Sequence, residues 1–181
     1  VDLFDDYRSA YCYSYVANYL AEATNSKLGS FYFGKSKTDR WGIPRRRLEK
    51  VYESFGAKLR LTFAGEEAHR SAASAFADST FKSLTSKADV LAISIDGICI
   101  GDLICQSYLR KDRETLDTKD ENLKKVIYDA YIIFRLSMDF FSANKVRALI
   151  ISHTVFIYYG IITRIASSLG VPVFRVNQTG W

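Results

Sequence analysis

Histidine and cysteine are scarce in this chain of 181 residues, which holds two histidines and three cysteines. These few residues show no spacing typical of a metal site, so we expect no zinc centre and no bound metal. The cysteines, an odd number, are expected to be reduced and buried as small apolar side chains of a cytoplasmic protein; they are Cys12, Cys99 and Cys105.

A long uninterrupted apolar run is also missing. The longest apolar stretch, 148–162, is broken by the polar residues at 152–154. It is shorter than the roughly 20 residues of a membrane-spanning helix. Because no secretory signal stands at the start, we expect a soluble, cytoplasmic protein.

Glycine-rich phosphate loops are absent too. Neither a Walker-type loop nor a G-x-G-x-x-G motif occurs, which argues against an ordinary nucleotide hydrolase or dehydrogenase. The composition, with 48% hydrophobic and 25% charged residues, is that of a globular protein. We expect one domain over residues 1–181. Its abrupt ends, a strand-like end at Val1 and a buried-strand pattern before Trp181, lead us to expect part of a longer two-domain protein.

Hydrophobic spacing predicts that helices and strands alternate along the chain. We expect helices over 9–24, 44–55, 66–86, 120–144 and 157–169, with another helical segment beginning at residue 101. We expect strands over 27–33, 58–63, 90–95, 148–151 and 171–176. This alternation is typical of an α/β, Rossmann-like, mostly parallel sheet with helices on both faces.

The first candidate site follows the strand that ends near Ile151. In open α/β sheets, ligands bind beyond the carboxyl ends of the strands. Ser152 and His153 lie there, just before a predicted helix. A histidine in this position can act as a general base near neutral pH, or donate to a phosphate or a sugar hydroxyl. The alternative is a histidine that caps the next helix or bonds to a backbone carbonyl.

The second candidate site is the start of the helical segment at Gly101. This glycine permits close backbone approach, and Asp102 is a favourable N-cap residue. Amides at a helix start suit an anion, and Arg110 adds a charged fork. Asp102 is also a second candidate base, although a helix start should lower its pKa. Capping without a ligand is the alternative.

A basic stretch around Trp41 is the third candidate. Its cations are Lys35, Lys37, Arg40, Arg45, Arg46 and Arg47. Together with the net charge of +5, they favour an anionic membrane surface or a polyprenyl phosphate. Nucleic acid and a plain solvated face are the alternatives, and no recognised nucleic-acid motif accompanies the charge. The corner at Asp5 and Asp6 is a weaker fourth candidate.

Two blocks of the sequence resemble a known family. Residues 97–104 (GICIGDLI) followed by 107–110 (SYLR) resemble the signature G-I-x-I-G-D-L-I-Y-D-x-Y-L-R. This signature occurs in bacterial capsule and surface-carbohydrate biosynthesis proteins, which are glycosyltransferases of the two-Rossmann (GT-B) type. Residues 151–154, 158–160, 164–166 and 170–173 resemble the next block of that family. The resemblance covers roughly residues 90–176, and the chain departs from it at Cys105 and Gln106, where the pattern has Tyr-Asp.

The resemblance implies the acceptor-side, N-terminal half of such an enzyme. The acceptor would be a carbohydrate or a lipid-linked sugar, and the nucleotide-sugar donor would bind chiefly to a second domain that this chain lacks. The chain alone would then not catalyse transfer. It would lie in the cytoplasm, at the inner face of the membrane, and it would need no cofactor.

We therefore expect His153 and Asp102 as catalytic residues. Substrate contacts are expected from Gly101, Arg110, Ser152, Tyr158 and Arg164. The competing hypothesis is a non-catalytic Rossmann module that binds a nucleotide or nucleotide sugar.

Overall fold

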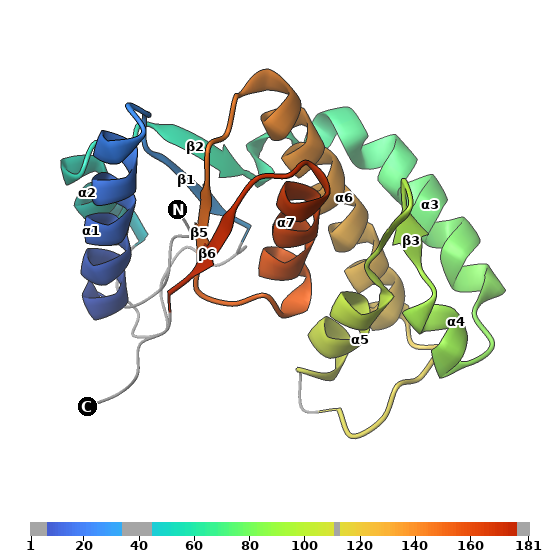
Figure 1. The fold of residues 1–181 in the computed structure, drawn as a ribbon. Coiled ribbons are helices and arrows are strands. Elements are labelled where there is room, and N and C mark those ends of the chain that lie inside the picture. The colour runs from blue at the N-terminus through green and yellow to red at the C-terminus, as the bar shows by residue number, and fades with distance from the viewer. Residues whose placement is uncertain (1–6, 34–44, 111–112, 177–181) are drawn as a thin grey trace.

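The computed structural model describes residues 7–33, 45–110 and 113–176 (Figure 1). In chain order the elements are α1 (Tyr7–Ala23), β1 (Gly29–Tyr32), α2 (Arg45–Ser54), β2 (Leu59–Thr62), the 3-10 helix η1 (Phe63–His69), α3 (Arg70–Ser83), α4 (Lys87–Leu91), β3 (Ser94–Ile95), β4 (Ile98–Cys99), α5 (Gly101–Leu109), α6 (Glu121–Ala143), β5 (Leu149–Ile151), α7 (Phe156–Ser168) and β6 (Val173–Arg175). The predicted mixed α/β class is confirmed, with helices making up most of the described chain.

The strands form three separate pairs. β1 pairs in parallel with β2, and β5 pairs in parallel with β6, whereas β3 and β4 form a short antiparallel hairpin. Within the described ranges no backbone ladder joins one pair to another. The parallel pairing that the sequence predicts is present, but a continuous Rossmann-like sheet is not observed there.

The long helix α6 is the centre of the hydrophobic core. Its apolar residues recur every three or four positions, so they share one face of the helix. Leu123, Ile127, Ala130 and Phe134 on this face are fully buried. The helix begins after Asp120, whose carboxylate accepts a hydrogen bond from the backbone amide of the second helical residue. α6 packs against both α3 and α7, which places it between the two ends of the core.

The prediction of a strand over residues 90–95 is wrong in its first half. Residues Lys87–Leu91 form the short helix α4, and only Ser94–Ile95 are extended. A capping box explains the difference, because the Ser86 side chain accepts from the amide of Asp89 and the Asp89 carboxylate accepts from the amide of Ser86. Satisfying these amides favours a helix start over a strand.

The prediction of three buried cysteines is wrong for two of them. Cys105 is buried in α5, but Cys12 and Cys99 are exposed. Cys12 lies on the solvent side of α1, and Cys99 lies at the end of the β3–β4 hairpin, where a small side chain meets water.

Candidate functional site

The end of β5 and the start of α7 form the first part of the site. All three residues of β5 are buried, and the chain leaves the core at Ser152. The N-cap residue of α7 is Val155, and its side chain makes no capping hydrogen bond. Instead, the amide of Ile157 donates to the hydroxyl oxygen of Ser107 on α5, at 2.8 Å. A residue 50 positions away thus caps α7 and fixes its start against α5.

Phe156, the first residue of α7, has a left-handed backbone conformation with φ of +63°. This conformation is strained for a bulky aromatic residue and persists only where the surroundings impose it. One such contact comes from Arg110, whose guanidinium carbon lies 4.7 Å from the centre of the Phe156 ring. Strained residues cluster at binding and catalytic sites, so the turn after β5 is a natural place for a ligand.

His153 stands between these elements, as the sequence predicts. Its Nδ1 lies 2.8 Å from the hydroxyl oxygen of Ser152, and its half-buried ring lies 5.7 Å from the ring of Tyr159. Burial lowers the pKa of His153 below its ordinary value of 6.5, and the positive charges of Arg175 and Arg110 lower it further. The imidazole is therefore neutral at pH 7 and can accept a proton.

A cavity of about 290 Å³ opens beside this turn, between the end of α5, the first half of α6 and the start of α7. Two predicted contact residues, Arg110 and Tyr158, line it. Lys125 on α6 adds a second cation, and the single carboxylate among the lining residues is that of the buried Asp129. The positive charge near the mouth of the cavity favours an anionic ligand.

Asp102 and Arg164 are paired with each other. The two guanidinium nitrogens of Arg164 lie 2.7 and 2.6 Å from the two carboxylate oxygens of Asp102, which is a bidentate ion pair. The hydrogen bonds from Arg164 lower the pKa of Asp102, although partial burial acts in the opposite direction. A carboxylate held ionised in this way is a weak base, so the geometry favours a structural role for it.

Gly101 allows the backbone of α5 to pack closely against that of α4. A Cβ at this position would lie 2.1 Å from the carbonyl oxygen of Val90 and 2.5 Å from that of Leu91. The first turn of α5 therefore presses directly on α4. Gly160 of α7 plays the same part opposite Leu103, where a Cβ would lie 2.4 Å from that side chain. The close backbone approach expected at Gly101 is present, and its partner is α4.

The structure thus divides the predicted residues between two places. α5 and α7 run antiparallel, with Asp102 and Arg164 at one end and Arg110 and Phe156 at the other. Arg110 follows Asp102 by eight positions, a separation of about 12 Å along a helix. His153, Arg110 and Tyr158 are brought together around the turn after β5, and Asp102 with Arg164 lies away from them.

Sequence reasoning missed four polar lining residues of the cavity. Three of them, Asn122, Lys125 and Asp129, lie on one line of α6 at spacings of three and four residues. Such a polar line beside an apolar face is a signal that the sequence itself carries. The fourth, Ser107, belongs to the SYLR motif, but its contact with α7 has no local signature.

Unfolding at acid pH tests how much the carboxylates that cap helices contribute to stability. Hydrogen bonds from the side chain and backbone of Thr85 and from Ser86 lower the pKa of Asp89 to about 2. Bonds from the backbone and side chain of Asn122 lower that of Asp120 to about 2. A carboxylate whose pKa is lower in the folded state than in the unfolded state stabilises the fold at pH values above its unfolded-state pKa. This stabilisation is lost as the pH falls through the folded-state pKa. We expect the melting temperature to fall between about pH 4 and pH 2.

This expectation is checked by thermal unfolding at pH 5, 4, 3 and 2.5. The variants Asp89→Asn and Asp120→Asn cannot ionise, so each should show a shallower fall of melting temperature over this range. A slope equal to that of the unaltered chain in both variants would contradict the assignment.

The basic stretch at residues 35–47 and the corner at Asp5 and Asp6 lie outside the residues whose side chains the structure describes. Within the described ranges, no group of three or more His, Cys, Asp or Glu side chains could hold a metal ion. None of the described helices combines the length and apolarity needed to cross a bilayer.

Comparison with known proteins gives no match: no family model, curated protein or solved structure is similar to this chain. The resemblance to surface-carbohydrate glycosyltransferases therefore depends on the motif residues alone.

Proposed function

We propose that this chain is the acceptor-side domain of a glycosyltransferase that builds a bacterial surface polysaccharide, of capsule or O-antigen type, from nucleotide-sugar donors. In this proposal the two parallel strand pairs belong to one Rossmann-like sheet with helices on both faces, the N-terminal half of a GT-B fold. Two sequence blocks support it, and they pack on each other through Asp102 and Arg164.

One observation carries the proposal: the cavity with Arg110 and Lys125 reaches the start of α7, the helix that follows β5 and the neutral His153. The side chains of Arg110 and His153 are close enough for the positive charge of Arg110 to lower the pKa of His153. Arg110 places its guanidinium over the Phe156 ring, and the N–H groups of a guanidinium are hydrogen-bond donors that lie in its own plane. These donors suit the diphosphate of a lipid-linked sugar acceptor.

The chemistry expected of His153 is proton transfer. In the tautomer whose Nδ1–H donates to Ser152, Nε2 carries the lone pair that accepts the proton of an acceptor hydroxyl. The hydroxyl oxygen forms a bond to the anomeric carbon of the donor sugar, and the bond from that carbon to the donor phosphate breaks. The leaving nucleoside diphosphate keeps the electron pair. A second domain would hold it, so the isolated chain would bind acceptor and not catalyse transfer.

The partners follow from this assignment. The acceptor is a carbohydrate or a lipid-linked sugar, and an anionic membrane surface would lie close to it at the inner face of the membrane. Nucleic acid is not among the partners we propose.

The second candidate is a module that binds a nucleotide or nucleotide sugar without catalysis. It is favoured by the ion pair of Asp102 with Arg164, which removes one of the two candidate bases from the cavity. The two proposals differ in whether the chain alone holds a nucleotide sugar.

Calorimetric titration tests the proposal directly. Geranyl diphosphate represents the lipid diphosphate, and UDP-glucose represents the donor. We expect the isolated chain to bind geranyl diphosphate, and UDP-glucose weakly or not at all. Arg110→Ala and Lys125→Ala should each weaken the first binding by at least about tenfold, since a charge-assisted hydrogen bond contributes about 1.5–3 kcal/mol.

The matched control is Lys82→Ala, which removes an exposed cation from α3, outside the cavity. Equal weakening by all three substitutions would reduce the effect to net charge. Micromolar binding of UDP-glucose by the isolated chain would favour the second candidate instead.

A further inference from the structure

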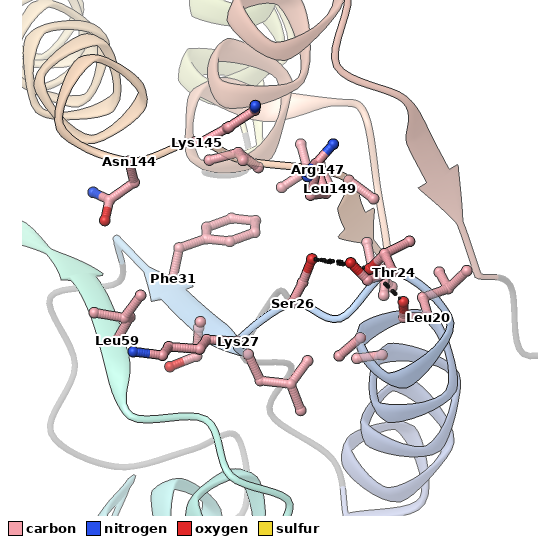
Figure 2. Close-up of a pocket in the computed structure, with 18 of the residues that line it drawn as sticks. Leu20, Thr24, Ser26, Lys27, Phe31, Leu59, Asn144, Lys145, Arg147 and Leu149 are labelled. Atoms are coloured by element: carbon pink, nitrogen blue, oxygen red, sulfur yellow. Dashed lines mark hydrogen bonds between the residues drawn. The ribbon is translucent and has the colours of Figure 1, made fainter.

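A second, larger cavity lies between the two parallel strand pairs. Its volume is about 360 Å³, and it is lined by the first residues of both β1 and β5, from Gly29 to Phe31 and from Leu149 to Ile150. Figure 2 shows Phe31 on β1 and Leu149 across the cavity from it. Its lining is mixed, because apolar residues such as Phe31 and Leu149 line it together with polar and charged ones such as Asn144.

Helices cover this cavity from two opposite sides. Ala17 and Leu20 of α1 line one side, and Phe140 of α6 and Ile162 of α7 line the other. In Figure 1, α1 and α2 lie on one side of the strands, and α6 and α7 lie on the other. The cavity therefore has the surroundings of a central strand in an α/β sheet: a strand edge to each side, and helices above and below.

The chain path gives the order of the strands. α1 and α2 pack on each other through Tyr15 and Phe55, whose ring centres lie 5.1 Å apart. Both helices thus lie on the same face. Connections between parallel strands are right-handed, so two successive connections over one face move along the sheet in one direction. A strand that leads into α1 must then lie beside β1, on the side away from β2.

That side of β1 is the side of the cavity. The residues before β1 and those before β5 both line it, so the two strands begin at the same end and run the same way. No residue of β6 lines the cavity, so β6 lies beyond β5. The order β2, β1, cavity, β5, β6 leaves one central position of a doubly wound sheet open between the two pairs.

We propose that this cavity receives a fifth parallel strand, an apolar extended segment of the polypeptide that leads into α1 from its amino-terminal side. This strand joins the two pairs into one five-stranded parallel sheet. A strand buried on both faces is expected to be rich in valine and isoleucine. The proposal does not depend on glycosyl transfer.

An extension of the chain before Val1 tests this inference. The added segment is Met-Lys-Ile-Val-Val-Ile, and its control is Met-Lys-Ile-Pro-Val-Pro, which stays apolar but lacks the amides that a strand needs. We expect the first extension to raise the melting temperature by at least about 5 °C, as the filling of a core cavity should in a domain of this size. Amide hydrogen exchange in β1 and β5 should slow by at least about tenfold. The proline extension should do neither.

A lipid is the other occupant to test, because Lys27, Lys145 and Arg147 line the same cavity. Dodecyl phosphate is titrated into the unextended chain and into the chain with the valine–isoleucine extension. No binding, or binding that the extension abolishes, supports a strand position. Micromolar binding that the extension leaves unchanged would make the cavity a lipid site and overturn the proposal. Equal melting temperatures and exchange rates for both extensions would overturn it as well.

Discussion

Replacing His153 with alanine in the two-domain glycosyltransferase that we propose should lower turnover at least about a hundredfold while the fold survives. General-base assistance contributes a factor of about 10² to 10⁴ in rate, and the half-buried His153 lies on the surface of the turn after β5. The loss should fall on kcat, since the proton moves in the transition state. Steady-state kinetics with a lipid-linked acceptor measure it, and circular dichroism checks that the variant is folded.

The pH dependence of the same enzyme adds a second readout. Burial and the charges of Arg175 and Arg110 lower the pKa of His153 below 6.5, so the basic form is present at pH 7. The rate of the unaltered enzyme should therefore fall only below about pH 6.5. His69→Ala is the matched control, because this second histidine pairs with Asp139 at 2.6 Å on η1 and α6. Near-normal turnover of the His153 variant would make His153 a structural residue.

Replacing Gly101 with alanine should destabilise the fold strongly. The added Cβ would lie 2.1 Å from the carbonyl oxygen of Val90, which belongs to backbone and cannot rotate away. Overpacking in a core costs about 1–3 kcal/mol, and contact with backbone places this case at the upper end. For a domain of this size, about 3 kcal/mol corresponds to a fall of roughly 6–12 °C in melting temperature.

Gly65→Ala provides the comparison for this substitution. Its Cβ would also be close to a neighbour, at 2.9 Å, but the neighbour is the end of the flexible Leu136 side chain. Rotation of that side chain should limit the fall to a few degrees. Thermal unfolding of both variants gives the result, and equal losses would show that backbone contact at Gly101 is not the cause.

Long elements with strong periodicity were the most predictable part of the fold. The helix expected over 120–144 is observed as Glu121–Ala143, and that expected over 157–169 is observed as Phe156–Ser168. In both cases the apolar spacing alone decides which face is buried. The region around Asp89 was less predictable, because its apolar run suits either a strand or a helix. There the capping box at Ser86 decides the outcome, and apolar spacing alone does not reveal it.

The site was predictable where it depends on strand ends. His153 lies directly after β5, as the apolar run before it indicates. The pairing of Asp102 with Arg164 was not predictable, because 62 positions separate the two residues and nothing local marks either as a partner. The same holds for Ser107, whose hydroxyl accepts from the amide of Ile157 across 50 positions. Such contacts depend on how α5 and α7 cross, which only the folded chain defines.

The packing of α5 on α7 has a mechanical consequence. Contacts at Gly101 and Gly160 leave no space for one helix to slide or roll over its neighbours, and the pair of Asp102 with Arg164 fixes their far end. We therefore expect α5 and α7 to move together, because Gly160 packs on Leu103 and Arg164 pairs with Asp102. A displacement at the Arg110 end would be transmitted along their length to the β3–β4 hairpin, where the carbonyl of Cys99 accepts from Arg164.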